Sequence, residues 1–189
     1  MTSSPSTLPT IQRELAACGL KIIGNDRVGR VLRVLAATRT NGVVLQVGVH
    51  ALEYAPWIID GMDITTRLIL NVDGPAPSEQ LQPLFRTDLR VTLHHQDTRQ
   101  FLGDVARHRF DLIVLDPSAA SDEILSACLQ VLDSGGLLVI IGDGGDPADA
   151  GVFSNCHVVS LGELTIVAQV APHSKPTRKG GRSARRQQR

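Results

Sequence analysis

The sequence is short of cysteine, of aromatic residues and of long apolar runs, and these shortages exclude several classes of protein. Its three cysteines, Cys18, Cys128 and Cys156, are odd in number, far apart and without C-x-x-C spacing. They therefore indicate neither a disulfide framework nor a zinc site. No segment approaches the roughly 18 to 20 continuous apolar residues of a membrane span, and the first residues hold neither a basic leader nor an apolar signal core. We expect a soluble, cytoplasmic protein.

Net charge is also absent, but the two signs are unevenly distributed. The segment from Pro172 to Arg189 holds seven of the 19 basic residues and no acid, which leaves 12 basic against 19 acidic residues elsewhere. Because this segment has no Val, Leu or Ile, we predict a disordered tail. The tail is interpreted either as a solvated segment or as a nonspecific contact with the phosphates of RNA, DNA or another acidic partner. It has no aromatic residues to stack on bases.

The remaining chain has the size and composition of one domain. Its 189 residues are 42% hydrophobic, enough to bury one full core. We predict a flexible N-terminus over residues 1–9, an α/β domain over 10–171 and the basic tail over 172–189. Apolar runs predict strands, and segments with helical periodicity lie between them. The strands are expected at 43–48, 67–73, 90–95, 110–116 and 136–142, and the helices at 11–17, within 25–40, and at 51–61, 78–85, 98–106 and 121–132.

Strands that are apolar throughout and alternate with helices predict a parallel sheet covered on both faces, the doubly wound architecture. The end of the domain differs, because "CHVVSLGELTIVAQV" reads as two strands joined across Gly162 and Glu163. The sequence therefore predicts a seven-stranded mixed sheet, in which five parallel strands are followed by an antiparallel hairpin.

The motifs of this domain resemble those of a known enzyme family. The segments are "GNDRVGRVLRVLAA" before the first strand, "VVLQVG" in that strand, "LILNVD" ending on an acid, and "RFDLIVLD" followed by "ILSACLQVLDSGGLLVI". Their order from Gly24 to Val170 resembles the class I S-adenosylmethionine-dependent methyltransferases, within them the small bacterial O-methyltransferases related to catechol O-methyltransferase. The resemblance implies S-adenosylmethionine as cofactor and a small-molecule hydroxyl as methyl acceptor.

The resemblance also implies a site at the carboxyl ends of the first strands, where open parallel sheets bind ligands in general. Gly48 lies in the turn that approaches the cofactor. Asp73 matches the acid that accepts both ribose hydroxyls, a role that suits a carboxylate because it offers acceptors only. Asp97 matches the position that bonds the adenine amino group. From the residues alone, either acid could instead form a turn or cap a helix.

Asp116 is the candidate catalytic residue. In the catechol-type enzymes the matching Asp helps to hold a divalent cation that positions the acceptor hydroxyl. Those enzymes add an Asp-Asn pair after the next strand, where this chain has Ile140 and Ile141, with Asp143 displaced. One carboxylate does not make a metal site, so we predict no stable catalytic metal.

The first motif departs most from the family. Where the family has an acid followed by Gly-x-Gly-x-Gly, this chain reads Gln46, Val47, Gly48, Val49, His50, Ala51 and Leu52. Only the first glycine remains, and His50 and Leu52 project side chains where backbone usually approaches the ligand. Two hypotheses follow, a divergent methyltransferase and an inactive scaffold that binds a partner. His50 could act as a general base or be structural.

An RNA methyltransferase is a further alternative. The segment "VLDPSA" resembles the Asp-Pro-Pro-aromatic motif of enzymes that modify base nitrogens, but Ser118 and Ala119 replace the second proline and the aromatic residue. The surface that would stack on a flipped base is therefore missing. The sequence carries no signal for or against a homodimer.

Overall fold

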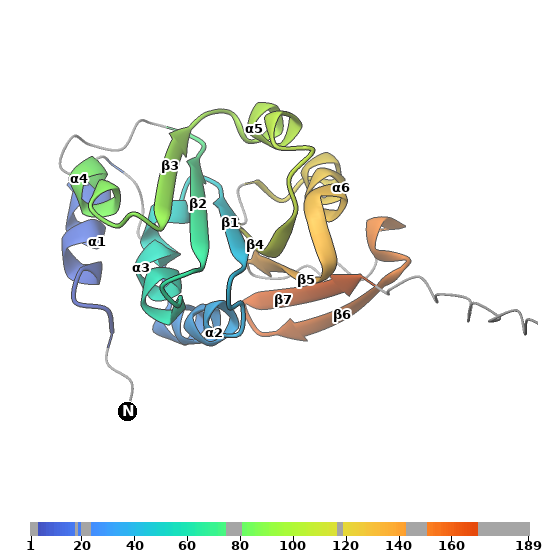
Figure 1. Cartoon of the computed structure of the whole chain (residues 1–189), viewed down its shortest axis with the longest axis horizontal. Helices are drawn as coiled ribbons and strands as arrows, with labels where there is room; N and C mark the ends of the chain where they lie inside the picture. The colour runs from blue at the N-terminus through green and yellow to red at the C-terminus, as the bar shows by residue number, and fades with distance from the viewer. Residues whose placement is uncertain are drawn as a thin grey trace, which may run out of the picture.

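The structure is a computed structural model that describes residues 4–17, 19, 24–74, 81–116, 119–142 and 151–169. The basic tail, Cys18, Asp143 and the first residues of the helix expected at 78–85 lie outside these ranges. Helices and strands alternate along the chain (Figure 1). They are α1 (Leu8–Ala17), α2 (Asp26–Ala37), β1 (Val43–Val47), α3 (Ala51–Gly61), β2 (Arg67–Val72), α4 (Leu81–Arg86), β3 (Val91–His95), α5 (Thr98–Asp104), β4 (Phe110–Leu115), α6 (Asp122–Val131), β5 (Leu132–Ile141), the 3-10 helix η3 (Gly151–Phe153), β6 (Cys156–Leu161) and β7 (Leu164–Gln169).

The sheet confirms the predicted architecture. Its seven strands run in the order β3-β2-β1-β4-β5-β7-β6. The first five are parallel to their neighbours, while β7 pairs antiparallel with both β5 and β6. The hairpin turns at Gly162 and Glu163, as predicted. Because β1 lies between β2 and β4, the order reverses beside β1, and open sheets of this kind bind ligands at such a point.

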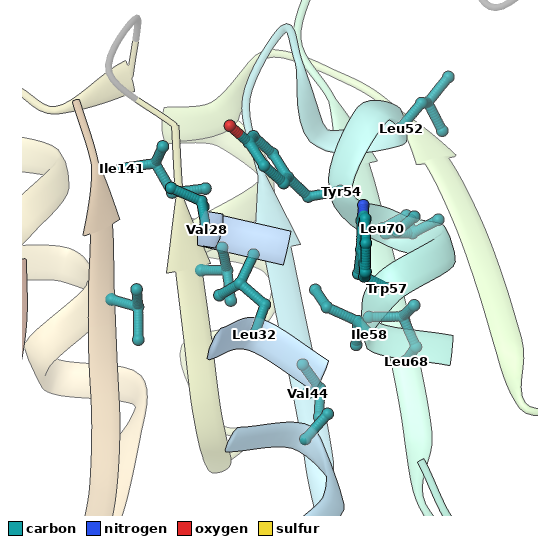
Figure 2. Packing of buried hydrophobic residues seen from close by; sticks show 14 of the residues in the cluster. Val28, Leu32, Val44, Leu52, Tyr54, Trp57, Ile58, Leu68, Leu70 and Ile141 are labelled. Atoms are coloured by element: carbon teal, nitrogen blue, oxygen red, sulfur yellow. The ribbon is translucent and has the colours of Figure 1, made fainter. Parts of the chain in front are cut away.

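Two apolar clusters lie on the two faces of the sheet. Val44, Leu70 and Val114 face α1, α2 and α3, whereas Leu45 and Ile113 face α5 and α6. Figure 2 shows the first cluster, in which Trp57 and Tyr54 reach from α3 toward the residues of α2 and β1. This division explains the continuous apolar runs, because alternate residues of each strand are buried on opposite faces.

Local signals fix the starts of two helices. Asn25 caps α2 by accepting a hydrogen bond from the Arg27 backbone at 2.8 Å, and Ser121 caps α6 by accepting one from Ile124 at 3.4 Å. Asn and Ser are both preferred at the N-cap of a helix. In contrast, α1 begins at Leu8 rather than at residue 11, because Leu8 is also buried against the core.

The last parallel strand is longer than predicted. The sequence "SGG" was expected to separate α6 from a strand at 136–142, but β5 begins at Leu132, directly after α6. Leu132 pairs with Phe110, and the register shifts between Phe110 and Leu112. The pairing therefore continues through the glycines by means of an irregularity rather than a loop. Within the described ranges, no helix has the length and apolar content to cross a bilayer.

Candidate functional site

The turn after β1 carries Gly48, which has a φ of +129°. Residues with a side chain rarely adopt this backbone conformation, so the position favours glycine. A Cβ here would also overlap the carboxylate of Asp116, from the end of β4. The remaining glycine of the first motif is thus required by this chain's own packing.

Asp116 is folded onto that turn. It is 2% exposed, and its Oδ2 accepts a hydrogen bond from the His50 backbone N at 2.6 Å. The bond is short, and hydrogen bonds to an ionised carboxylate are shorter than those between neutral groups. The structure thus places the predicted catalytic carboxylate against the turn between β1 and α3, which it holds in place; its catalytic role stays a prediction.

The two predicted nucleoside acids meet at the start of α5. Asp73 follows β2 and its Oδ2 accepts a hydrogen bond from the Thr98 backbone N at 3.1 Å. Asp97 is the N-cap of α5, and its Oδ1 accepts one from the Gln100 backbone N at 2.9 Å. Each bond uses one oxygen of its carboxylate. The capping role open to both acids is therefore present, and it leaves acceptor capacity on each side chain.

The four residues expected at the site, Gly48, Asp73, Asp97 and Asp116, form one continuous rim. The Asp73 backbone N donates to the Gly48 carbonyl at 3.4 Å, which joins the ends of β1 and β2, and the Asp116 backbone N donates to Val47 at 3.2 Å. Gly48, Asp73, Asp97 and Asp116 therefore all lie at the carboxyl edge of the sheet.

Buried polar groups lie below this rim. Asn71 donates from Nδ2 to the Gln96 carbonyl at 3.0 Å, but its Oδ1 has no hydrogen-bond partner among the described residues. The same holds for the Thr98 hydroxyl and for Oε1 of Gln46, which occupies the place of the family's acid in β1. Buried polar atoms without a partner are uncommon, and a catalytic role or a bound water or ion is among their explanations.

The other end of the rim, beside the start of α3, is filled by two side chains. Glu53 has no exposed side-chain surface and accepts a hydrogen bond from the Gly24 backbone N. Tyr54 is 1% exposed, and its hydroxyl accepts one from the Asn25 backbone N at 3.3 Å. We call Gly24, Asn25, Glu53 and Tyr54 the α2–α3 plug, because its side chains occupy the space between the starts of these two helices.

Further ionisable side chains lie beside the plug. Glu163, at the tip of the hairpin, accepts a hydrogen bond from Asn25 Nδ2 at 2.7 Å, and His50 Nδ1 lies 3.8 Å from Glu53 Oε2. Burial raises the pKa of Tyr54 to about 12, and the charges of Glu53, Glu163 and Asp116 contribute further, against the lowering effect of the Asn25 backbone hydrogen bond. This end of the rim therefore disfavours additional negative charge.

The described residues contain no group of three His, Cys, Asp or Glu side chains that could hold a metal ion. Ile141, at the place of the family's additional ligands, is buried in the apolar core instead. The expectation that Asp116 holds no stable metal remains a prediction.

Comparison with protein-family models finds no match, and comparison with curated protein sequences finds none either. Solved structures do match. A protein from Corynebacterium glutamicum is 22% identical over 93% of this chain and 94% of its own, with a TM-score of 0.69. The O-methyltransferase from Bacillus cereus, solved in complex with S-adenosylhomocysteine, is 16% identical over 90% and 93%, with a TM-score of 0.69. The O-methyltransferase TomG from Streptomyces achromogenes, solved in complex with S-adenosylmethionine, is 15% identical over 90% and 92%, with a TM-score of 0.72.

This chain has the class I S-adenosylmethionine-dependent O-methyltransferase fold. The two ends of an S-adenosylmethionine molecule make different demands on this edge of the sheet. Asp73 and Asp97 keep the acceptor capacity that a ribose and an adenine amino group would require. The amino-acid end does not fit, since Glu53 and Tyr54 already occupy backbone donors there.

Glu53 and Tyr54 were not among the site residues expected from the sequence. A signal for Glu53 was present, because it is the one charged residue in the apolar run "ALEYAPWII". All residues from Ala51 to Ile58 are buried, so a charge in this run needs an internal partner. That partner, Gly24, lies 29 positions away, and the sequence does not pair the two.

Proposed function

We propose that this chain binds an adenine nucleoside at the carboxyl edge of its sheet, with the ribose at Asp73 and the base beside Asp97. The observation that carries the proposal is the joint position of these two acids at the start of α5, next to the Gly48 turn. The solved structures of this fold in complex with S-adenosylmethionine or S-adenosylhomocysteine support an adenine nucleoside as the ligand class.

The nominal activity of this fold is methyl transfer to the hydroxyl of a small molecule. We propose that this activity is reduced or lost in the present chain. The support is the α2–α3 plug together with Asp116, whose carboxylate is engaged by the His50 backbone. Methyl transfer between bound molecules depends on positioning, and a ligand displaced from its ordinary place loses that advantage.

A calorimetric titration and a thermal-shift assay with adenosine and S-adenosylhomocysteine test nucleoside binding. A ligand at about 100 times its Kd stabilises the native state by about 2.7 kcal/mol, which raises Tm by roughly 5 to 10 °C at this chain length. Asp73→Asn is expected to weaken binding about tenfold or more, while its amide oxygen still accepts the bond from Thr98.

Asp133→Asn is the matched control, because Asp133 lies near the start of β5, at the opposite edge of the sheet. It removes the same charge without touching the rim. Absence of saturable binding of both adenosine and S-adenosylhomocysteine, or equal affinities in the Asp73 variant and the control, would show that the proposal is wrong.

A second function rests on the seven basic residues from Lys175 to Arg189, which lie outside the described residues. We propose that they contact phosphate groups of RNA or another acidic partner. Retention on an RNA column should fall steeply with salt, because bound cations of the nucleic acid are released. Deleting residues 172–189 should abolish this retention; unchanged retention after deletion would contradict the proposal.

A further inference from the structure

Two successive backbone N–H groups immediately before α2, those of Gly24 and Asn25, are both occupied by side chains of α3. The Gly24 group donates to the Glu53 carboxylate, and the Asn25 group donates to the Tyr54 hydroxyl at 3.3 Å. Successive backbone N–H groups at the start of a helix favour a carboxylate. At this position the chain supplies that carboxylate itself.

The Glu53 carboxylate packs closely against the Gly24 backbone. A Cβ on Gly24 would overlap the Glu53 carboxyl group, so the two residues are already at the closest approach that glycine permits. Leu52 and Tyr54, on either side of Glu53, are each 1% exposed. Figure 2 shows that Leu52 and Tyr54 extend from the same end of α3. A ligand carboxylate at the Gly24 N–H would have to displace the Glu53 carboxylate that already accepts its hydrogen bond.

The charge of the surroundings acts in the same direction. The charges of Asp116 and Glu163 act on the Tyr54 hydroxyl together with that of Glu53, whose Oε2 lies 3.8 Å from His50 Nδ1. An incoming carboxylate would face like charges in a partly desolvated place, where repulsion is stronger than in water. A neutral group at the same end would avoid this repulsion.

We propose that the site selects adenine nucleosides whose 5′ substituent carries no carboxylate, and that Glu53 excludes the amino-acid end of S-adenosylmethionine. Adenosine and 5′-methylthioadenosine represent the accepted class, and S-adenosylhomocysteine represents the excluded one. The inference rests on the proposed nucleoside binding, and it assigns to Glu53 the choice among nucleosides.

Calorimetric titration of the full chain with 5′-methylthioadenosine and with S-adenosylhomocysteine tests the inference. The wild-type chain should bind the first at least about tenfold more tightly. Glu53→Ala should bind S-adenosylhomocysteine about tenfold better than the wild-type chain does, with little change for 5′-methylthioadenosine, because the Gly24 N–H becomes available to the ligand.

Glu53→Gln provides a second variant in case the alanine variant does not fold. Its amide oxygen still accepts the bond from Gly24 while the charge is lost, so the preference should decrease to a smaller extent. Asp133→Asn, which removes a distant charge, should keep the wild-type ratio. Far-ultraviolet circular dichroism establishes that each variant is folded.

The outcomes separate this inference from the proposed function. Tighter binding of S-adenosylhomocysteine than of 5′-methylthioadenosine by the wild-type chain would overturn the inference and keep the nucleoside site. A wild-type preference that neither Glu53 variant alters would overturn the role of Glu53. Failure of both ligands and of adenosine to bind would overturn the proposed function itself.

Discussion

Replacing Gly48 by alanine tests the packing at the centre of the rim. Gly48 has a φ of +129°, and its added Cβ would overlap the Asp116 carboxylate. Gly162, in the hairpin turn, provides a matched comparison, because it has a φ of +63° and no heavy atom within 4 Å of an added Cβ. Alanine at Gly162 therefore meets a conformational cost alone, about 1 to 2 kcal/mol.

Alanine at Gly48 meets that cost and a second one. Moving the Asp116 carboxylate breaks its bond to the His50 N–H, and a bond to a charged group contributes about 1.5 to 3 kcal/mol. Gly48→Ala should therefore cost about 2.5 to 5 kcal/mol in total. At this chain length the loss corresponds to a Tm lower by roughly 5 to 20 °C.

Urea denaturation followed by the fluorescence of Trp57, the single tryptophan of the chain, measures the loss. A double-mutant cycle with Asp116→Ala isolates the contribution of the carboxylate, and it should return a coupling of about 1.5 to 3 kcal/mol. If Gly48→Ala costs no more than Gly162→Ala, or costs the same with and without Asp116, the reasoning is refuted.

Three further predictions concern ionisation and helix packing. Tyr54 is the single tyrosine, so the ultraviolet absorbance of its phenolate should titrate near pH 12 rather than 10, and the stability linked to this shift is present below pH 10 and lost as pH rises toward 12. A midpoint near pH 10 in the folded chain would contradict the burial of its hydroxyl. Hydrogen bonds from Thr65 and Thr66 lower the pKa of Asp63 from 3.8 to about 2, so Asp63→Asn should remove a stability component that is present above pH 3.8 and lost as pH falls toward 2. Identical acid unfolding curves for the wild-type chain and the variant would show that this component does not exist. Arg33 lies 2.6 Å from Asp60 and 4.9 Å from the Trp57 ring, so Arg33→Met should lower the free energy of unfolding by about 1 kcal/mol and shift the Trp57 emission; an unchanged emission would argue against the ring contact.

Much of the fold could be predicted from the sequence because its signals are local. Continuous apolar runs gave the parallel strands, and Gly162 with Glu163 marked the hairpin. Asn25 and Ser121 marked helix starts through bonds to residues two or three positions away. The start of β5 could not be predicted in this way. Leu132 pairs with Phe110 of β4 through an irregular register, and this partner lies on the far side of α6 in the sequence.

The candidate site divides along the same line. Asp73 and Asp97 could be placed beside one another because each follows a strand of the same parallel sheet. The fate of the first motif could be predicted only as a loss of glycine. That a buried Glu53 would meet the Gly24 backbone, and that Asp116 would fold over the turn, depends on contacts between residues 29 and 66 positions apart. Such contacts are set by tertiary packing, and local sequence patterns do not predict them.

The bond between Asn25 and Glu163 joins residues 138 positions apart, and it has a consequence for the order of synthesis. The Gly142 N–H also donates to the Glu163 carbonyl at 2.9 Å, and β5 pairs with β7, which follows Glu163 in the chain. During translation, the earlier strands emerge from the ribosome first. Asn25, before α2, cannot form its bond to Glu163 until the hairpin has been synthesised. A nascent chain arrested before Glu163 therefore lacks this bond to the α2–α3 plug, however complete its parallel strands.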